Sequence, residues 1–137
     1  MSAQRAGVPV LGANLPRADM RASMADSQLD LRLPAPAFKA QQQLIRQGHC
    51  DLLPEGQITP MTRIQIARDR RMADTLVKAL QPGKVVVLIS GSVHADKQLG
   101  VPQHLPAGLQ VKSVRLLAGG KSLPGEAFDS VWATEAT

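Results

Sequence analysis

Short apolar runs along the chain predict β-strands that are buried on both faces. The first run is VPVLGANL at residues 8–15, the second is VVVLI at residues 85–89, and the third covers residues 111–118. Continuous aliphatic and β-branched runs of this length are typical of strands in a parallel sheet, which helices cover on both sides. A shorter apolar stretch at residues 128–133 predicts a last strand.

Between the first two runs, the apolar positions follow a helical period instead. Residues 16–25 and 39–47 predict two short helices, and residues 60–80 predict the longest helix of the chain. Thr59 is a suitable N-cap for the long helix, and Pro60 would occupy its first turn, where proline is tolerated. The longest helix therefore leads almost directly into the second apolar run.

Segments rich in proline and glycine separate these elements. Residues 31–38, 49–59, 91–106 and 123–125 predict loops or turns, the third with room for a turn of helix. Strands that alternate with helical crossovers indicate an α/β fold, here a small, mostly parallel sheet with packed helices. The length of the chain, residues 1–137, fits one domain.

Charge and composition narrow the class of partner. The formal net charge of +5 suits an anionic ligand. Nucleic-acid modules usually combine such charge with stacking aromatics, whereas this chain has two Phe, one Trp and no Tyr, so we expect no nucleic-acid partner. No apolar run is long enough to span a bilayer, and the N-terminus lacks the apolar core of a signal peptide. The chain as written therefore predicts a cytoplasmic protein without a transmembrane segment.

The second apolar run leads directly into GSVH at residues 91–94. In open α/β sheets, ligands bind beyond the carboxyl ends of the strands, and Gly91 would permit a sharp turn at that edge. His94 is then expected to face the crevice, where an imidazole can bind a metal, transfer a proton or hydrogen-bond a carboxylate. The alternative is a histidine that only braces the loop, and position alone favours that alternative.

A second group of candidates shares one face of the long helix. Gln65, Asp69 and Met72 are spaced by four and three residues, and Arg68 lies beside them. Arg68 could clamp a carboxylate, and Met72 could contact a flat apolar ligand. The alternative is a solvated Arg–Asp pair and a methionine of the core.

One further segment and two loop residues are weaker candidates. HCD at residues 49–51 has no accompanying cluster with the spacing of a zinc site, and a lone Cys50 favours a small buried side chain. Lys97 and His104 lie in the loop after His94, where either could reach an anionic group.

Taken together, these segments resemble successive blocks of the ChaN family of haem-binding proteins. GHCDLLPE, MTRIQIARDRRMADTL and VVVLISGSVHADKQLGVPQHL follow the order of the family, with PVLGANLPR before them and FDSVWAT after them. The resemblance covers nearly the whole chain. It implies one partial domain, the C-terminal half of a fold shared with erythromycin esterases and Tiki proteases.

The resemblance also implies a function and a location. We expect haem binding linked to iron uptake or haem handling, in a family of periplasmic or membrane-attached lipoproteins. Arg68 or Lys97 would meet the haem propionates. The positions expected to form the pocket are Gln65, Arg68, Asp69, Met72, Gly91 and His94, with His49 as a further cofactor-binding candidate.

Two departures from the family qualify this expectation. The resemblance suggests a tyrosine as the axial ligand of haem iron, but the chain has none. His94 is our expected metal ligand, although His49, His104, Cys50 or a methionine could also replace the tyrosine. The first of two Gly-x-x-His motifs is also missing. The alternative is a related hydrolase, and in that case we expect this fragment to be inactive. The unpaired edge of a half-sheet favours a homodimer.

Overall fold

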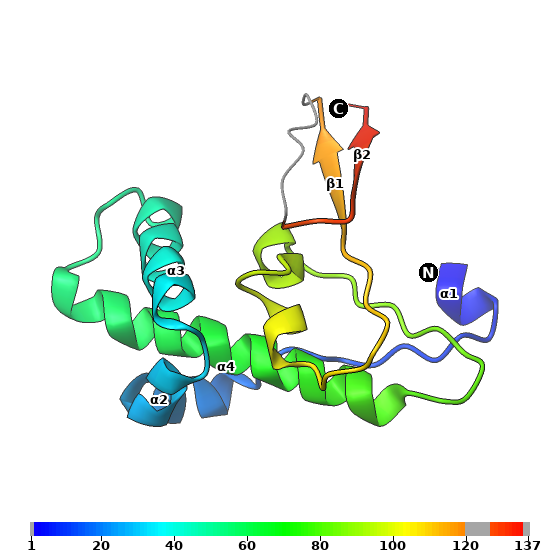
Figure 1. Ribbon diagram of the computed structural model, residues 1–137, viewed down its shortest axis with the longest axis horizontal. Helices are drawn as coiled ribbons and strands as arrows, with labels where there is room; N and C mark the ends of the chain where they lie inside the picture. The colour runs from blue at the N-terminus through cyan, green and yellow to red at the C-terminus, as the bar shows by residue number, and fades with distance from the viewer. Residues whose placement is uncertain (1, 120–126, 136–137) are drawn as a thin grey trace.

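The computed structural model describes residues 2–119 and 127–135 and is organised around one long helix, α4, Glu55–Ala79 (Figure 1). Helices α2, Arg17–Ala25, and α3, Ala35–Gly48, pack against α4. The predicted short helix at residues 16–25 is confirmed by α2, and the predicted long helix at residues 60–80 is confirmed by α4.

The long helix begins earlier than the sequence indicated. Pro54 occupies the N-cap position, and Pro60 lies inside the helix rather than at its start. The Arg46 guanidinium donates two hydrogen bonds of 3.0 Å to the carboxylate of Glu55. An acidic residue in the first turn also interacts favourably with the helix dipole. The prediction that Thr59 caps this helix is therefore wrong, because the extra turn gains an ion pair with α3 that the local sequence did not reveal.

Helix α3 also begins earlier than expected, inside the segment that we predicted as a loop. Its first turn contains Pro36, where the missing backbone N–H has no intrahelical partner to lose. A 3₁₀ helix, Ser27–Leu31, precedes it, and the Asp26 side chain accepts a hydrogen bond of 3.0 Å from the backbone N–H of Gln28. The loop prediction for residues 31–38 is thus wrong in its second half, since proline there starts a helix.

Buried aliphatic side chains form two groups along α4. The first group is Leu29, Leu33, Ile66 and Ala67, and the second is Met72, Ala73 and Val101. An ion pair joins α4 to the 3₁₀ helix that contains Leu29 of the first group. The Arg63 guanidinium donates hydrogen bonds of 2.8 and 2.7 Å to Asp30, and a third of 3.0 Å to the carbonyl of Met24.

The sheet consists of two parallel strands, β1, Val114–Ala118, and β2, Ser130–Thr134. Val114 lies opposite Ser130 in the register. The predicted strands at residues 111–118 and 128–133 are confirmed, with bounds shifted by at most three residues. The expected turn at residues 123–125 lies outside the described residues. The fold is a helix-rich α/β arrangement with a small parallel sheet, as the sequence predicted.

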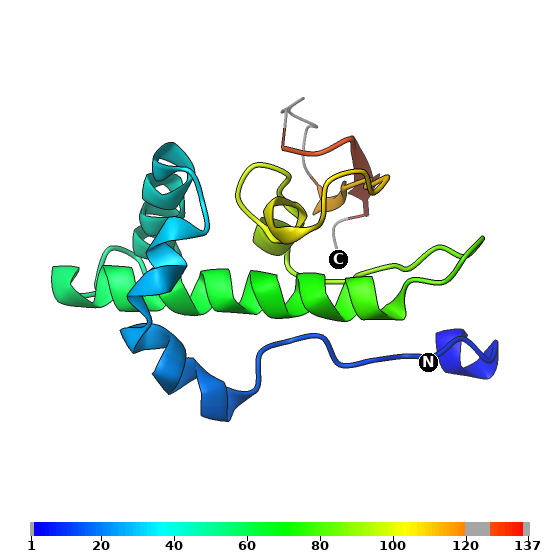
Figure 2. The same ribbon diagram turned by 60° about the horizontal axis from the view of Figure 1, so that its bottom comes forward.

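The first two apolar runs do not form β-strands in the described part of the chain. After a short helix α1, Ser2–Arg5, the backbone of residues 8–15 is irregular, and residues 85–89 are extended without a β-partner. Figure 2 shows this second segment returning along α4. The two strand predictions are wrong because an apolar pattern specifies a strand only when neighbouring strands complete its hydrogen bonds.

Residues 85–89 nevertheless alternate as a strand would. Val85, Val87 and Ile89 are 89, 75 and 92% exposed, whereas Val86 and Leu88 are half-buried. Residues 85–88 together contribute to the wall of a cavity. The backbone groups of residues 85–90 form no hydrogen bond with another described backbone group. This segment is therefore an extended edge that carries one uncovered apolar face.

Candidate functional site

His94 lies between the end of the extended segment and the long helix. It belongs to a 3₁₀ helix, Ser92–Ala95, which is closed by a hydrogen bond of 3.1 Å from the N–H of His94 to the carbonyl of Gly91. The Nδ1 atom of His94 lies 2.5 Å from Oδ1 of Asp69. The side-chain amide of Gln65 contacts the same nitrogen at 3.2 Å. The structure thus brings Gln65, Asp69 and His94 together. Gln65 and Asp69 lie one turn apart on α4, and His94 faces them from the 3₁₀ helix.

Asp69 is fully buried, with an exposed fraction of 0%. Burial raises the pKa of this carboxyl group to about 6, against the opposing effects of the His94 hydrogen bond and the Arg68 charge. The second oxygen, Oδ2, has no hydrogen-bond partner among the described residues. His94 is therefore the principal group that stabilises this buried carboxylate.

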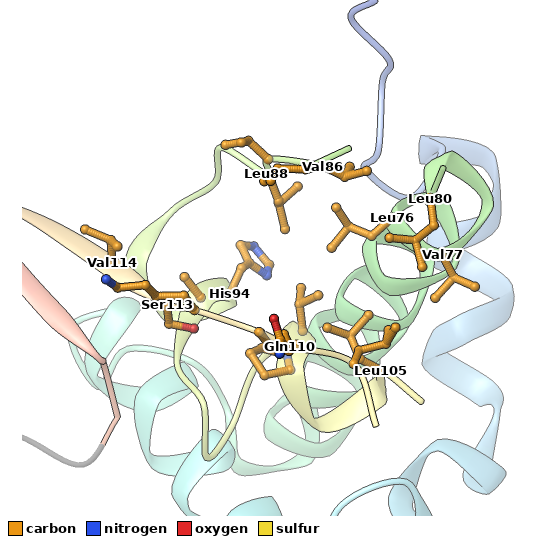
Figure 3. A pocket seen from close by; sticks show the side chains of 18 residues that line it. Leu76, Val77, Leu80, Val86, Leu88, His94, Leu105, Gln110, Ser113 and Val114 are labelled. Atoms are coloured by element: carbon orange, nitrogen blue, oxygen red, sulfur yellow. The ribbon is translucent and has the colours of Figure 1, made fainter. Parts of the chain in front are cut away.

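The hydrogen bond to Asp69 decides which atom of His94 remains free. A carboxylate accepts a hydrogen bond, so in the ionised pair the ring proton is on Nδ1 and Nε2 keeps its lone pair. None of the described residues hydrogen-bonds to Nε2. The ring lines a cavity, and Figure 3 shows it among the surrounding aliphatic side chains.

The cavity has a volume of about 430 Å³. This value lies within the roughly 300–1,000 Å³ that small-molecule sites occupy. Its wall is mainly aliphatic and comes from the C-terminal half of α4, the extended segment, a 3₁₀ helix, Val101–His104, and residues 109–114. Gln110, Lys112 and Ser113 add polar groups to the wall. The cavity can therefore hold a largely apolar ligand with a few polar substituents.

Gly100 fixes the backbone around His94, although our sequence reasoning did not single it out. A Cβ atom at this position would overlap the carbonyl groups of His94 and Val93. The N–H of Gly100 also donates a hydrogen bond of 2.8 Å to the carbonyl of Asp96. Its place in the GVP block of the family resemblance was the available signal. Gly91, by contrast, has φ −61° and ψ 148°, which any residue adopts, so the sharp glycine turn that we expected there is absent.

Two other predicted residues of α4 lie away from the cavity wall. Met72 is buried in the second core group with Ala73 and Val101. Nη2 of Arg68 lies 3.9 Å from the Met20 sulfur, and its buried Nε has no partner among the described residues. Neither side chain lines the cavity, so neither forms part of its surface.

His49 and Lys97 are also placed outside the cavity. His49 is the exposed C-cap of α3 and donates a hydrogen bond of 2.8 Å to the carbonyl of Ile45. Lys97 forms an ion pair of 2.7 Å with Asp129. We expected a lone cysteine to be buried, but Cys50 is exposed. These residues are therefore not brought together with His94.

No group of three or more His, Cys, Asp or Glu side chains in the described ranges could hold a metal ion. A bare transition-metal ion needs several protein ligands. Haem iron differs, since the porphyrin supplies four nitrogens and the protein needs to add a single axial ligand. One imidazole with a free Nε2 on an aliphatic wall therefore fits haem better than it fits a bare ion.

Comparison with known proteins now decides the family. A family profile described as haem-binding uptake, Tiki superfamily, ChaN matches residues 1–105. The chain belongs to the ChaN family. A solved structure of ChaN from Campylobacter jejuni, described as showing cofacial haem binding, superposes with a TM-score of 0.70 and 28% sequence identity. The match covers 84% of this chain and 47% of that one, so the present chain spans about half the length of its relative.

Two further findings accompany these matches. No curated protein sequence matches the chain. Within residues 2–119 and 127–135, no helix combines the length and the apolar composition needed to cross a membrane. The expected relation to erythromycin esterases stays a prediction.

Proposed function

We propose that this ChaN-family chain binds haem in the cavity beside His94, with Nε2 of His94 as the protein ligand of the iron. The observation that carries the proposal is the free Nε2 on an aliphatic wall, since Asp69 already occupies Nδ1. Bound haem would supply a redox-active iron, and the cavity would supply one ligand and an apolar surround. Membership of a haem-binding family supports the assignment.

A different cation from those expected is suited to the haem propionates. Lys97 is held by Asp129, and Arg68 does not line the cavity. Lys112 does line it and is exposed, so its ammonium group can reach a carboxylate at the cavity mouth. We therefore assign the propionate contact to Lys112.

Hemin titration followed by the Soret band tests this proposal. The full chain is expected to give a saturable shifted band, and His94→Ala should lose most of the affinity. His49→Ala is the matched control, because it removes an imidazole that is exposed on α3 and is expected to leave the titration unchanged. A chain that gives no shifted band, or equal affinities for the wild type and His94→Ala, would refute the proposal.

Hydrolysis is a second candidate function, favoured by the same Asp–His pair. A histidine whose Nδ1 is hydrogen-bonded to a carboxylate is suited to act as a general base through Nε2. Turnover of p-nitrophenyl acetate that disappears in both Asp69→Asn and His94→Ala would support this alternative. Equal background rates in all three proteins would exclude it.

A second copy of the chain is proposed to cover the extended edge. Antiparallel pairing centred on Val87 would place Val85 opposite Ile89 of the second copy, so that apolar side chains meet across the strands. The same register sets Lys84 opposite Ser90 and keeps the two lysines apart. Exposed apolar edges of this kind are templates for pairing. The periplasmic or membrane-attached location of the family stays a prediction for this chain.

A further inference from the structure

We infer that Asp69 is a positioning residue that fixes the ring proton of His94 on Nδ1 and thereby directs an electron-rich Nε2 toward the cavity. This inference rests on the proposed haem function, because it concerns the atom that would bind the iron. It adds a role for a residue that does not touch the cavity. It also gives a role to a carboxylate that lies fully buried on the long helix.

Among the described residues, the carboxylate of Asp69 has one hydrogen-bond partner, His94. Oδ1 of Asp69 lies 2.5 Å from Nδ1 of His94, and Oδ2 finds no partner among the described residues. A charged acceptor strengthens a hydrogen bond roughly twofold relative to a neutral one. In an apolar setting, this single bond therefore dominates the choice between the two tautomers of the ring.

The imidazole has little freedom to escape this contact. Its backbone is held by the 3₁₀ hydrogen bond to Gly91 and by close packing against Gly100. Nε2 of Gln65, one turn earlier on α4, lies 3.2 Å from the same ring nitrogen. The amide nitrogen of Gln65 faces Nδ1 and can donate only to an unprotonated ring nitrogen, whereas a 180° turn of the amide presents its oxygen to an Nδ1–H. Because the amide can turn in this way and is neutral, it follows the tautomer that the charged Asp69 selects. The selection is left to Asp69.

The consequence for a bound iron follows from general coordination chemistry. A carboxylate that accepts the Nδ1 proton orients a ligating histidine and raises its basicity, and losing such a partner typically lowers metal affinity by about 10–100-fold. Asp69→Asn keeps the shape of the side chain but offers an amide. If the amide donates its N–H to Nδ1, the ring proton moves to Nε2, and iron binding through that nitrogen first requires the less favoured tautomer to form.

The tautomer can be measured in the protein without haem, by long-range ¹H–¹⁵N correlation of the ring nitrogens after ¹⁵N-histidine labelling. The chain has three histidines, and His94→Ala identifies the signal of interest. We expect the Nδ1–H form in the wild type and the Nε2–H form in Asp69→Asn. Asp74→Asn changes an exposed acid on the same helix and should leave the spectrum as in the wild type.

Hemin affinity provides the second readout. Asp69→Asn is expected to bind about 10–100-fold more weakly than the wild type, whereas Asp74→Asn should match the wild type. An Nε2–H tautomer of His94 in the wild type overturns the inference. An unchanged tautomer or unchanged affinity in a folded Asp69→Asn also overturns it. An Nδ1–H tautomer without hemin binding would instead overturn the proposed function and leave the positioning role intact.

Discussion

His104 makes the stability of the fold dependent on pH in a direction that the structure fixes. Burial, together with the nearby charges of Arg70 and Arg32, lowers the pKa of this imidazole from 6.5 to about 4, against a smaller opposing effect of Asp74. The buried Nε2 has no hydrogen-bond partner among the described residues, so no acceptor stabilises the protonated ring. His104 is therefore neutral in the folded chain over most of the physiological range.

The sign and size of the effect follow from linkage. Between pH 6.5 and pH 4 the unfolded chain takes up a proton at His104 that the folded chain does not, so this group lowers the free energy of unfolding as the pH falls. The full difference in pKa corresponds to about 3 kcal/mol, of which about 2 kcal/mol is lost between pH 7 and pH 5. Asp69 acts in the opposite direction, because its raised pKa makes the folded chain bind the extra proton.

Substitution isolates the contribution of His104 from that of Asp69. We expect His104→Gln to lose about 2 kcal/mol less stability than the wild type between pH 7 and pH 5. Urea unfolding followed by circular dichroism at the two pH values measures this difference. His49→Gln, which changes an exposed histidine, is the control and should behave as the wild type. Equal losses in His104→Gln and the wild type would show that the buried ring does not have the depressed pKa on which the reasoning depends.

Three further perturbations test packing and association. Gly100→Ala should lower the free energy of unfolding by about 1–3 kcal/mol, because its Cβ meets a backbone carbonyl, whereas Gly56→Ala in open space on α4 should raise it by about 0.5–1 kcal/mol. Ile66→Ala should cost about 2–5 kcal/mol at a fully buried site, and Leu52→Ala, at an 84% exposed site, should cost almost nothing. Val87→Lys should abolish a dimer detected by light scattering at concentrations where the wild type associates; a monomeric wild type would contradict edge pairing.

The helical part of the fold could be predicted because its determinants are local. Apolar positions on α4 recur with the helical period, and the same period places Gln65 and Asp69 on one face. His94 could be expected near that face because it directly follows an apolar segment. The start of α4 could not be predicted, since the ion pair between Arg46 and Glu55 joins two helices and has no signature in either one alone.

The cavity wall was harder to predict than its histidine. Lys112 and Gly100 lie far from α4 in sequence, and their roles depend on how the segments after the long helix fold back onto it. Met72 and Arg68 share the predicted helix face, yet they point into the core and toward Met20 rather than into the cavity. A helical wheel gives the face of a residue but not what packs against that face.

The sequence alone determined the long helix, the two strands of the sheet and the membership of a haem-binding family, because each depends on short-range periodicity or on motifs in a fixed order. Only the tertiary structure decided which nitrogen of His94 is free, since that depends on a buried carboxylate 25 residues away in sequence. It also decided that residues 85–89 remain unpaired. A strand is completed by hydrogen bonds from its neighbours, and no pattern within one segment can supply them.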